Sequence, residues 1–172
     1  DLGLIFYRKE FEFLKTISSL NFKIPQAFEE KLILIDTGKP VESTKEMVAL
    51  VGKRYNENPK RTEQTLYSIE KITKRMVISI VKEDVSLFEV CIRENQKLLE
   101  DLGIVSDYTK QQLEKLKSFG CGKVTGAGGN SQSSGLILFL VKDKNKIPEL
   151  KTKGINYLPF KQNIQGVTLL SS

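Results

Sequence analysis

The order of the hydrophobic patterns constrains the fold of this chain most. Strand-like apolar runs stand near both ends, at residues 4–7, 11–14, 31–38 and 135–141, and a helical period fills most of residues 43–120 between them. Strands, then a block of helices, then strands again are typical of an α+β domain. We therefore expect an α+β fold: a mostly antiparallel sheet with helices packed on one face.

The apolar runs also predict how individual strands are used. Residues 4–7 (LIFY) and 11–14 (FEFL) flank a charged turn, which is typical of a hairpin. The run in residues 31–38 (KLILIDTG) is continuous, as in a central strand. After residues 135–141 we expect a short helix near Ile147–Leu150 and a closing pair of strands around INYLPF and GVTLL.

Four helices are predicted between the strands, each from a start signal. Ser43 and Glu46 have the spacing of a capping box, because a serine is followed three residues later by a glutamate. Proline suits a first helical turn, aspartate can cap one, and glycine often follows a helix end. We therefore expect the second, third and fourth helices to start near Pro59, Asp84 and Asp107, and the fourth to stop at Gly120.

Composition excludes several kinds of chemistry. The chain has 172 residues, no histidine and two cysteines, Cys91 and Cys121, outside any CxxC motif. Without histidine there is no Ser-His-Asp or Cys-His mechanism, and a zinc site is not expected. The cysteine usage fits a reducing cytosol, the start lacks signal-peptide features, and no apolar run is long enough to span a bilayer. We expect a cytoplasmic protein without membrane association.

The net charge of +6 would suit an anionic partner. The lysines are scattered and paired with acids along the helical stretches, a pattern that is usually a solvated surface. No RNP-like aromatic motif and no basic stripe occurs, so nucleic acid is not expected as a partner.

A glycine stretch, Gly126-Ala127-Gly128-Gly129, lies between two predicted strands. It is not a P-loop, because no Gly-Lys-Ser/Thr follows, and Ser131 replaces the third glycine of a dinucleotide fingerprint. Glycines can still direct successive N–H groups into one concavity and let a phosphate approach the backbone. The alternative is a hairpin loop whose glycines only relieve positive φ angles.

A second candidate is the segment from Asp36 to Lys45, where a buried strand leads into a helix. A helix N-terminus presents unpaired N–H groups and a positive dipole, which favour a carboxylate or phosphate. The alternative is that Ser43 only caps its helix while Lys39 and Lys45 are solvated.

Three motifs in this order resemble the C-terminal half of a GHMP-type small-molecule kinase. They are LIDTG…STKEMV (34–48), ENQKLLEDLGIVS (94–106) and KVTGAGG (123–129). The resemblance covers nearly the whole chain. It implies that residues 1–172 form the ferredoxin-like C-terminal domain of such a kinase, with residues 1–30 as inter-domain strands that continue from an N-terminal domain. The start at Asp1 instead of a methionine fits a chain cut from something longer.

The resemblance also implies residue roles. The phosphate and ATP contacts would be Thr125, Gly126, Ala127, Gly128, Gly129 and Asn130. The acceptor substrate would contact Thr37, Ser43 and Thr44, with Thr44 preferred. No catalytic residue and no metal ligand are assigned to this chain, because the family's P-x-x-x-GLGSS-A motif, catalytic aspartate and magnesium-binding glutamate are absent from it. ATP and Mg²⁺ would be held mainly by the N-terminal half, and the chain should be inactive alone.

Within the family, the motifs are closest to members that phosphorylate mevalonate on the route to isoprenoid precursors. Phosphomevalonate or another GHMP acceptor is an alternative, and so is a non-catalytic ferredoxin-like binding module. The expected partners are mevalonate, ATP and the N-terminal half of the same kinase, with a homodimer as a further partner. The stretch Asn130–Gly135 departs from the family pattern, because it is about two residues longer and has serines in place of glycine and cysteine.

Overall fold

The computed structural model describes residues 4–9, 15–20 and 22–162. Its strands are β1 (Leu4–Lys9), β2 (Lys15–Leu20), β3 (Leu32–Asp36), β4 (Gly120–Val124), β5 (Leu136–Val141) and β6 (Tyr157–Pro159). Its helices are α1 (Gln26–Glu29), α2 (Thr44–Glu57), α3 (Pro59–Val81), α4 (Val85–Asp101), α5 (Asp107–Lys115), the 3₁₀ turn η1 (Lys144–Lys146) and α6 (Ile147–Thr152). None of the described helices combines the length and the apolar content that crossing a membrane requires.

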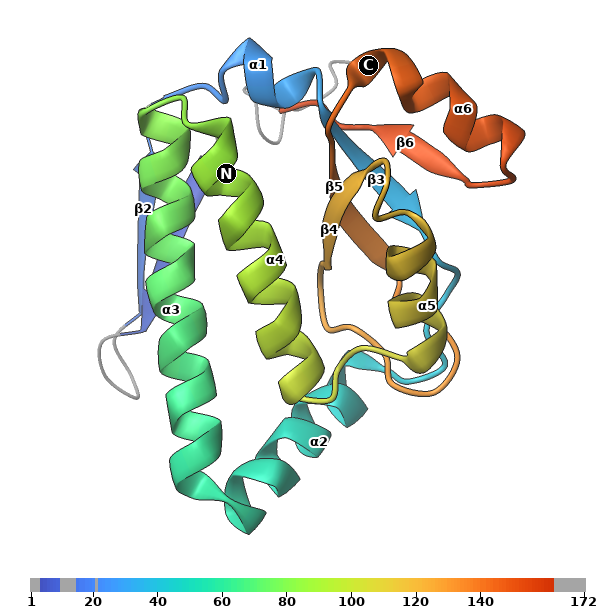
Figure 1. The fold of residues 1–172 in the computed structure, drawn as a ribbon. Coiled ribbons are helices and arrows are strands. Elements are labelled where there is room, and N and C mark those ends of the chain that lie inside the picture. The colour runs from blue at the N-terminus through green and yellow to red at the C-terminus, as the bar shows by residue number, and fades with distance from the viewer. Residues whose placement is uncertain (1–3, 10–14, 21, 163–172) are drawn as a thin grey trace, which may run out of the picture.

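Four strands form an antiparallel sheet in the order β4-β5-β3-β6 (Figure 1). The register places Leu140 of β5 opposite both Leu32 of β3 and Cys121 of β4. Because β3 lies between β5 and β6, the prediction of a central strand in residues 31–38 is confirmed. The α+β class and the antiparallel sheet are confirmed as well.

Helices cover both faces of this sheet, whereas we expected them on one. The strand LILFLV of β5 is apolar at successive positions, so it presents a hydrophobic surface on each side. One face packs against α2, α5 and α6 through a core that includes Ile35, Met47, Leu116, Ile137, Phe139 and Leu150. The other packs against α1, α3 and α4 through Phe28, Leu32, Ile80, Phe88, Ile92 and Leu140. In Figure 1, α4 and α5 accordingly lie on opposite sides of the sheet.

The predicted N-terminal hairpin is present, with β1 and β2 antiparallel and Leu4 opposite Leu20. Its second strand begins at Lys15, and the run at residues 11–14 lies outside the described residues. The short helix near Ile147–Leu150 is confirmed as α6, and β6 lies in INYLPF. The expected last strand, GVTLL, also lies outside the described residues.

Three of the four predicted helix starts are confirmed. Ser43 and Glu46 form a complete capping box on α2, Pro59 opens α3, and the Asp84 side chain accepts from Leu87 N–H at the start of α4. The fourth was wrong by one residue, because Ser106 caps α5 and Asp107 is its first residue.

The role of Gly120 was also wrong. Helix α5 ends at Lys115, and Gly120 is the first residue of β4. A Cβ at Gly120 would lie 2.0 Å from the carbonyl oxygen of Leu140. The glycine therefore permits close approach of β4 to β5 and does not stop the helix.

Candidate functional site

Three segments that the sequence singled out meet at one end of the sheet. The loop between β4 and β5 (residues 125–135) contacts both the chain after β3 and the connection between α4 and α5. The N–H of Gly129 donates to the Ile104 carbonyl at 3.0 Å, and Val105 forms a parallel bridge with Gly129. The N–H of Thr37 donates to the Gly135 carbonyl at 3.0 Å. The motifs TG…ST, LGIVS and TGAGG thus form one structural unit.

The first part of this loop, residues 125–130, is called the glycine half. Gly126 and Gly128 have φ angles of +67° and +76°, which L side chains rarely adopt. Around Gly126 the space is open, whereas a Cβ at Gly128 would lie 2.2 Å from the Ile104 carbonyl oxygen. Residues 126 and 127 form a hydrogen-bonded turn, and we find no acceptor within the described residues for the backbone N–H groups of Gly126 and Ala127. The glycine half therefore combines one fixed position with unused donors.

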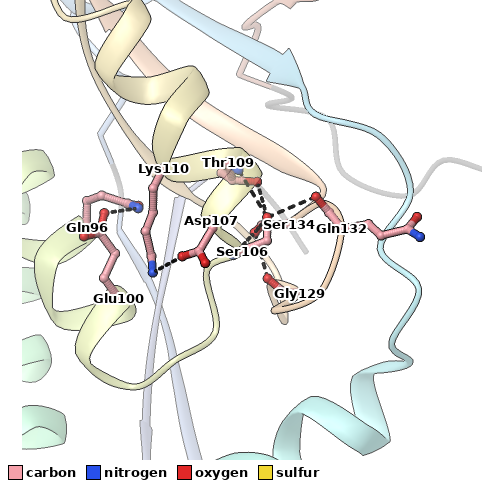
Figure 2. Close-up of polar contacts among 9 residues, drawn as sticks. All are labelled: Gln96, Glu100, Ser106, Asp107, Thr109, Lys110, Gly129, Gln132 and Ser134. Atoms are coloured by element: carbon pink, nitrogen blue, oxygen red, sulfur yellow. Dashed lines mark hydrogen bonds and ion pairs between the residues drawn. The ribbon is translucent and has the colours of Figure 1, made fainter.

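The second part, residues 131–135, is called the serine half, and buried hydroxyl groups hold it (Figure 2). Ser134, only 1% exposed, donates to the Gly129 carbonyl at 2.8 Å and accepts from the Ser106 N–H at 2.9 Å. The Ser106 hydroxyl lies 2.9 Å from that of the buried Thr109 and 3.3 Å from the Gln132 carbonyl oxygen. This network joins the loop to the start of α5.

The residues that follow β3 form hydrogen bonds with the same serine half from the other side. The Thr37 hydroxyl donates to the Gly135 carbonyl at 2.6 Å and lies 3.3 Å from the Ser134 nitrogen, whose N–H it accepts. The Ser133 hydroxyl donates to the Gly38 carbonyl at 3.1 Å. The Thr125 hydroxyl, at the other end of the loop, donates to the Leu136 carbonyl at 3.0 Å. The predicted contacts Thr37 and Thr125 thus use their hydroxyl protons to anchor the loop.

The predicted substrate residues are not gathered into one pocket. Thr37 lines a cavity of about 250 Å³ with Asp36, Tyr108 and Asn156, but Ser43 and Thr44 are not among its lining residues. Ser43 and Thr44 are exposed at the start of α2, and the Ser43 hydroxyl contacts the Glu46 carboxylate at 2.8 Å. The capping role that we held as the alternative for Ser43 is therefore present.

Glu42 links the helix start to the loop. Its Oε1 accepts the Ser131 N–H at 2.9 Å, and its Oε2 is shielded from solvent without a hydrogen-bond partner. Interaction with the Ser131 side chain, and with the backbone N–H groups of Ser131 and Asn130, holds the pKa of the Glu42 carboxyl below its usual 4.5, although burial opposes this. The carboxylate is therefore the charged form at neutral pH.

Two residues of β4 lie beside the loop. The Lys123 ammonium donates to the Val124 carbonyl at 3.0 Å, and burial lowers its pKa, so this side chain does not extend freely into solvent. Burial raises the pKa of the Cys121 thiol to about 11, as is typical of an unreactive buried cysteine. Within residues 4–9, 15–20 and 22–162, no group of three or more His, Cys, Asp or Glu side chains is arranged to hold a metal ion.

Sequence reasoning missed three residues that shape the site: Glu42, Ser106 and Ser134. Ser106 ends the motif LGIVS and Glu42 precedes the capping serine, so both stood inside segments already selected. Ser134 stood in the stretch that departs from the family pattern. No local signal pairs Ser134 with Ser106 or Glu42 with Ser131, because 28 and 89 residues separate them.

Comparison with known proteins places this geometry in a family. No protein-family model matches the chain. The mevalonate kinase of Schizosaccharomyces pombe is 30% identical over 180 residues, covering 97% of this chain and 41% of that protein. The mevalonate kinase of Pyrococcus horikoshii is 31% identical over 112 residues, covering 61% of this chain and 33% of that protein. The chain is related to the mevalonate kinases of the GHMP family.

A solved structure agrees with this relationship at the level of the fold. The crystal structure of L. major mevalonate kinase in complex with R-mevalonate superposes with a TM-score of 0.68 and 18% identity, over 90% of this chain and 48% of that one. The resemblance to GHMP kinases is thus confirmed. The chain spans between 33% and 41% of the length of the curated mevalonate kinases that it matches.

Proposed function

We propose that this chain forms the C-terminal domain of an ATP-dependent mevalonate kinase, which converts mevalonate to 5-phosphomevalonate. The observation that carries the proposal is the glycine half, whose N–H groups at Gly126 and Ala127 lack acceptors within the described residues. Such unused backbone donors, on a segment held at both ends, suit the oxygens of a phosphate chain. The relationship to mevalonate kinases supports the choice of this reaction.

In this proposal the six residues from Thr125 to Asn130 bind and orient the phosphates of ATP. Gly126 is exposed with open space where a Cβ would stand, so a phosphate can approach its backbone. Fixed N–H donors stabilise the charge that develops on the transferred group and need little reorganisation. Thr125 contributes by anchoring its end of the loop to Leu136.

The acceptor would lie on the side of the loop formed by Thr37, Ser43 and Thr44. Thr44 is exposed at the first turn of α2, where its hydroxyl and the helix dipole favour the carboxylate of mevalonate. Thr37 anchors the serine half and thereby sets the distance between the acceptor and the phosphates.

Magnesium, when bound with ATP, neutralises phosphate charge in kinases. The described residues offer no carboxylate cluster for it, so we assign it no ligand in this chain and derive no step from it. We likewise assign no general base here, and both functions would come from the N-terminal half of the kinase.

The test compares the 172-residue chain with the longer protein encoded together with its upstream sequence. With ATP and magnesium, the longer protein should phosphorylate mevalonate, and the 172-residue chain should show no turnover. Turnover by the short chain would contradict the divided site. If the longer protein phosphorylates phosphomevalonate but not mevalonate, the acceptor is wrong. If it phosphorylates neither, the proposed class of kinase is wrong.

A further inference from the structure

Glu42 binds the backbone N–H of Ser131, the first residue of the serine half, and lies against Gly129 of the glycine half. Its Oε1 lies 2.9 Å from the Ser131 nitrogen, and interactions with Ser131 and with the Asn130 N–H keep its carboxyl ionised. Its Oε2 would lie 3.2 Å from a Cβ on Gly129, so the carboxylate is pressed against the loop backbone. A negatively charged oxygen thus already sits where the loop offers its N–H groups.

This contact is not fully satisfied. The Oε2 atom of Glu42 is hidden from solvent and has no hydrogen-bond partner in the described part of the chain. Burial of an unpaired carboxylate oxygen costs free energy, because the water that it loses is not replaced. The side chain would recover that hydration by swinging out, and its interactions with the loop and with its own backbone hold it in place.

A phosphate on the glycine half would meet this carboxylate directly. Two negative groups at contact distance repel each other, and the Ser131 N–H can align well with only one of them. The charge of Glu42 already reaches the neighbouring Glu46, where it acts to raise the pKa of the Glu46 carboxyl against the stronger lowering by Ser43. Simultaneous occupation by the Glu42 carboxylate and a phosphate is therefore unfavourable.

We propose that Glu42 is an internal competitor of the phosphate ligand, bound to the loop when the site is empty and displaced when a phosphate binds. This rests on the proposed function of the glycine half. The displacement couples the loop to the start of α2, because Glu42 directly precedes Ser43 and Thr44 there. Binding of phosphate would release the segment that carries the proposed acceptor contacts.

The test titrates the 172-residue chain with inorganic triphosphate and follows the backbone N–H signals of residues 126–131 by NMR. The key variant is Glu42→Gln, which keeps a hydrogen-bond acceptor for Ser131 but removes the charge. We expect it to bind triphosphate about tenfold more tightly than the wild type. Glu46→Gln is the matched control, because it removes the same charge nearby, a glutamine preserves the capping box, and Glu46 makes no contact with the loop. It should change the affinity less than twofold.

A second variant, Glu42→Asp, tests the proposal if Glu42→Gln does not fold. Glu42→Asp retains the charge but is one methylene too short to reach Ser131, so it should bind triphosphate more tightly than the wild type by a smaller factor. Affinity equal to or below that of the wild type in these variants would overturn the proposal while leaving the phosphate role of the loop intact. An equal gain in Glu46→Gln would also overturn it, as a general charge effect. If no protein binds triphosphate at the loop, both this proposal and the phosphate role fail.

Discussion

The glycine half and the serine half of the loop between β4 and β5 use hydrogen bonds in opposite ways. In the serine half, Ser133 and Ser134 are buried and their hydroxyls bind the carbonyl groups of Gly38 and Gly129. In the glycine half, the N–H groups of Gly126 and Ala127 have no acceptor in the described chain. The polar groups of the serine half are bound within the protein, whereas two backbone donors of the glycine half have no acceptor in the described chain.

The comparison shows why a loop of this kind can be both open and ordered. A segment with unused donors has little enthalpy to fix it, and glycine adds backbone freedom. Here Gly129 is tied to Ile104 on one side and to Ser134 on the other. The order of the glycine half therefore comes from contacts outside it, and changes in either half should have different consequences.

The largest expected effect is at Gly128. In Gly128→Ala the new Cβ would meet the Ile104 carbonyl oxygen at 2.2 Å and the residue would be held at φ +76°. We expect a loss of about 3 kcal/mol in the free energy of unfolding, measured by urea denaturation. The matched control is Gly126→Ala, which has a similar φ of +67° but open space, and it should lose only about 1 kcal/mol. Equal losses would mean that the glycine half is not fixed at Gly128.

The next effect is at Ser134 in the serine half. Ser134→Ala removes a donor to the Gly129 carbonyl and an acceptor for the Ser106 N–H, and leaves both groups buried. We expect a loss of about 2 kcal/mol in the free energy of unfolding. Gln132→Ala serves as the control, because only the backbone carbonyl of Gln132 joins the network, and its side-chain truncation should stay within about 0.5 kcal/mol. A Ser134→Ala variant that is as stable as Gln132→Ala would show that Ser134 does not anchor the serine half.

The smallest effect is the pH dependence at the junction of the two halves. The folded-state pKa of Glu42 lies below its usual 4.5, so its contact with the loop contributes stability above pH 4.5 and loses it as the pH falls through the folded value. The hydrogen exchange of the Ser131 N–H should therefore accelerate, relative to neighbouring N–H groups, below pH 4.5. This transition should vanish in Glu42→Gln and persist in Glu46→Gln. A transition centred above 4.5 would contradict the assignment.

Much of the fold could be predicted because its signals are local. The capping box of Ser43 and Glu46 and the proline at the start of α3 depend only on residues within one helical turn. The central position of β3 followed from its continuous apolar run. The expectation of helices on one face was wrong because β5 is apolar at successive positions, so both of its sides are covered by helices.

The candidate site was predicted in part for the same reason. The positive φ angles at Gly126 and Gly128 follow from glycine in a short connection, and the structure confirms them. The roles of Thr125–Asn130, Thr37, Ser43 and Thr44 in ligand binding stay predictions. The prediction of Asp107 as a cap was wrong by one residue, and because aspartate and serine are nearly equal caps, residue type alone does not distinguish Asp107 from its neighbour Ser106. Ser106 also accepts the Thr109 N–H and meets the distant Ser134, a contact that local sequence does not contain.

By itself, the sequence determined the order of strands and helices, the positions that only glycine can hold, and the relationship to the GHMP kinases. These depend on the period of apolar residues, on backbone sterics and on short motifs. Only the tertiary structure decided which polar groups pair across the sheet end. Glu42 meets Ser131 and Thr37 meets Ser134 because β3 and β5 are neighbouring strands whose ends coincide. No local sequence signal predicts these pairings, because each polar group can hydrogen-bond to water equally well until the strands bring its partner close.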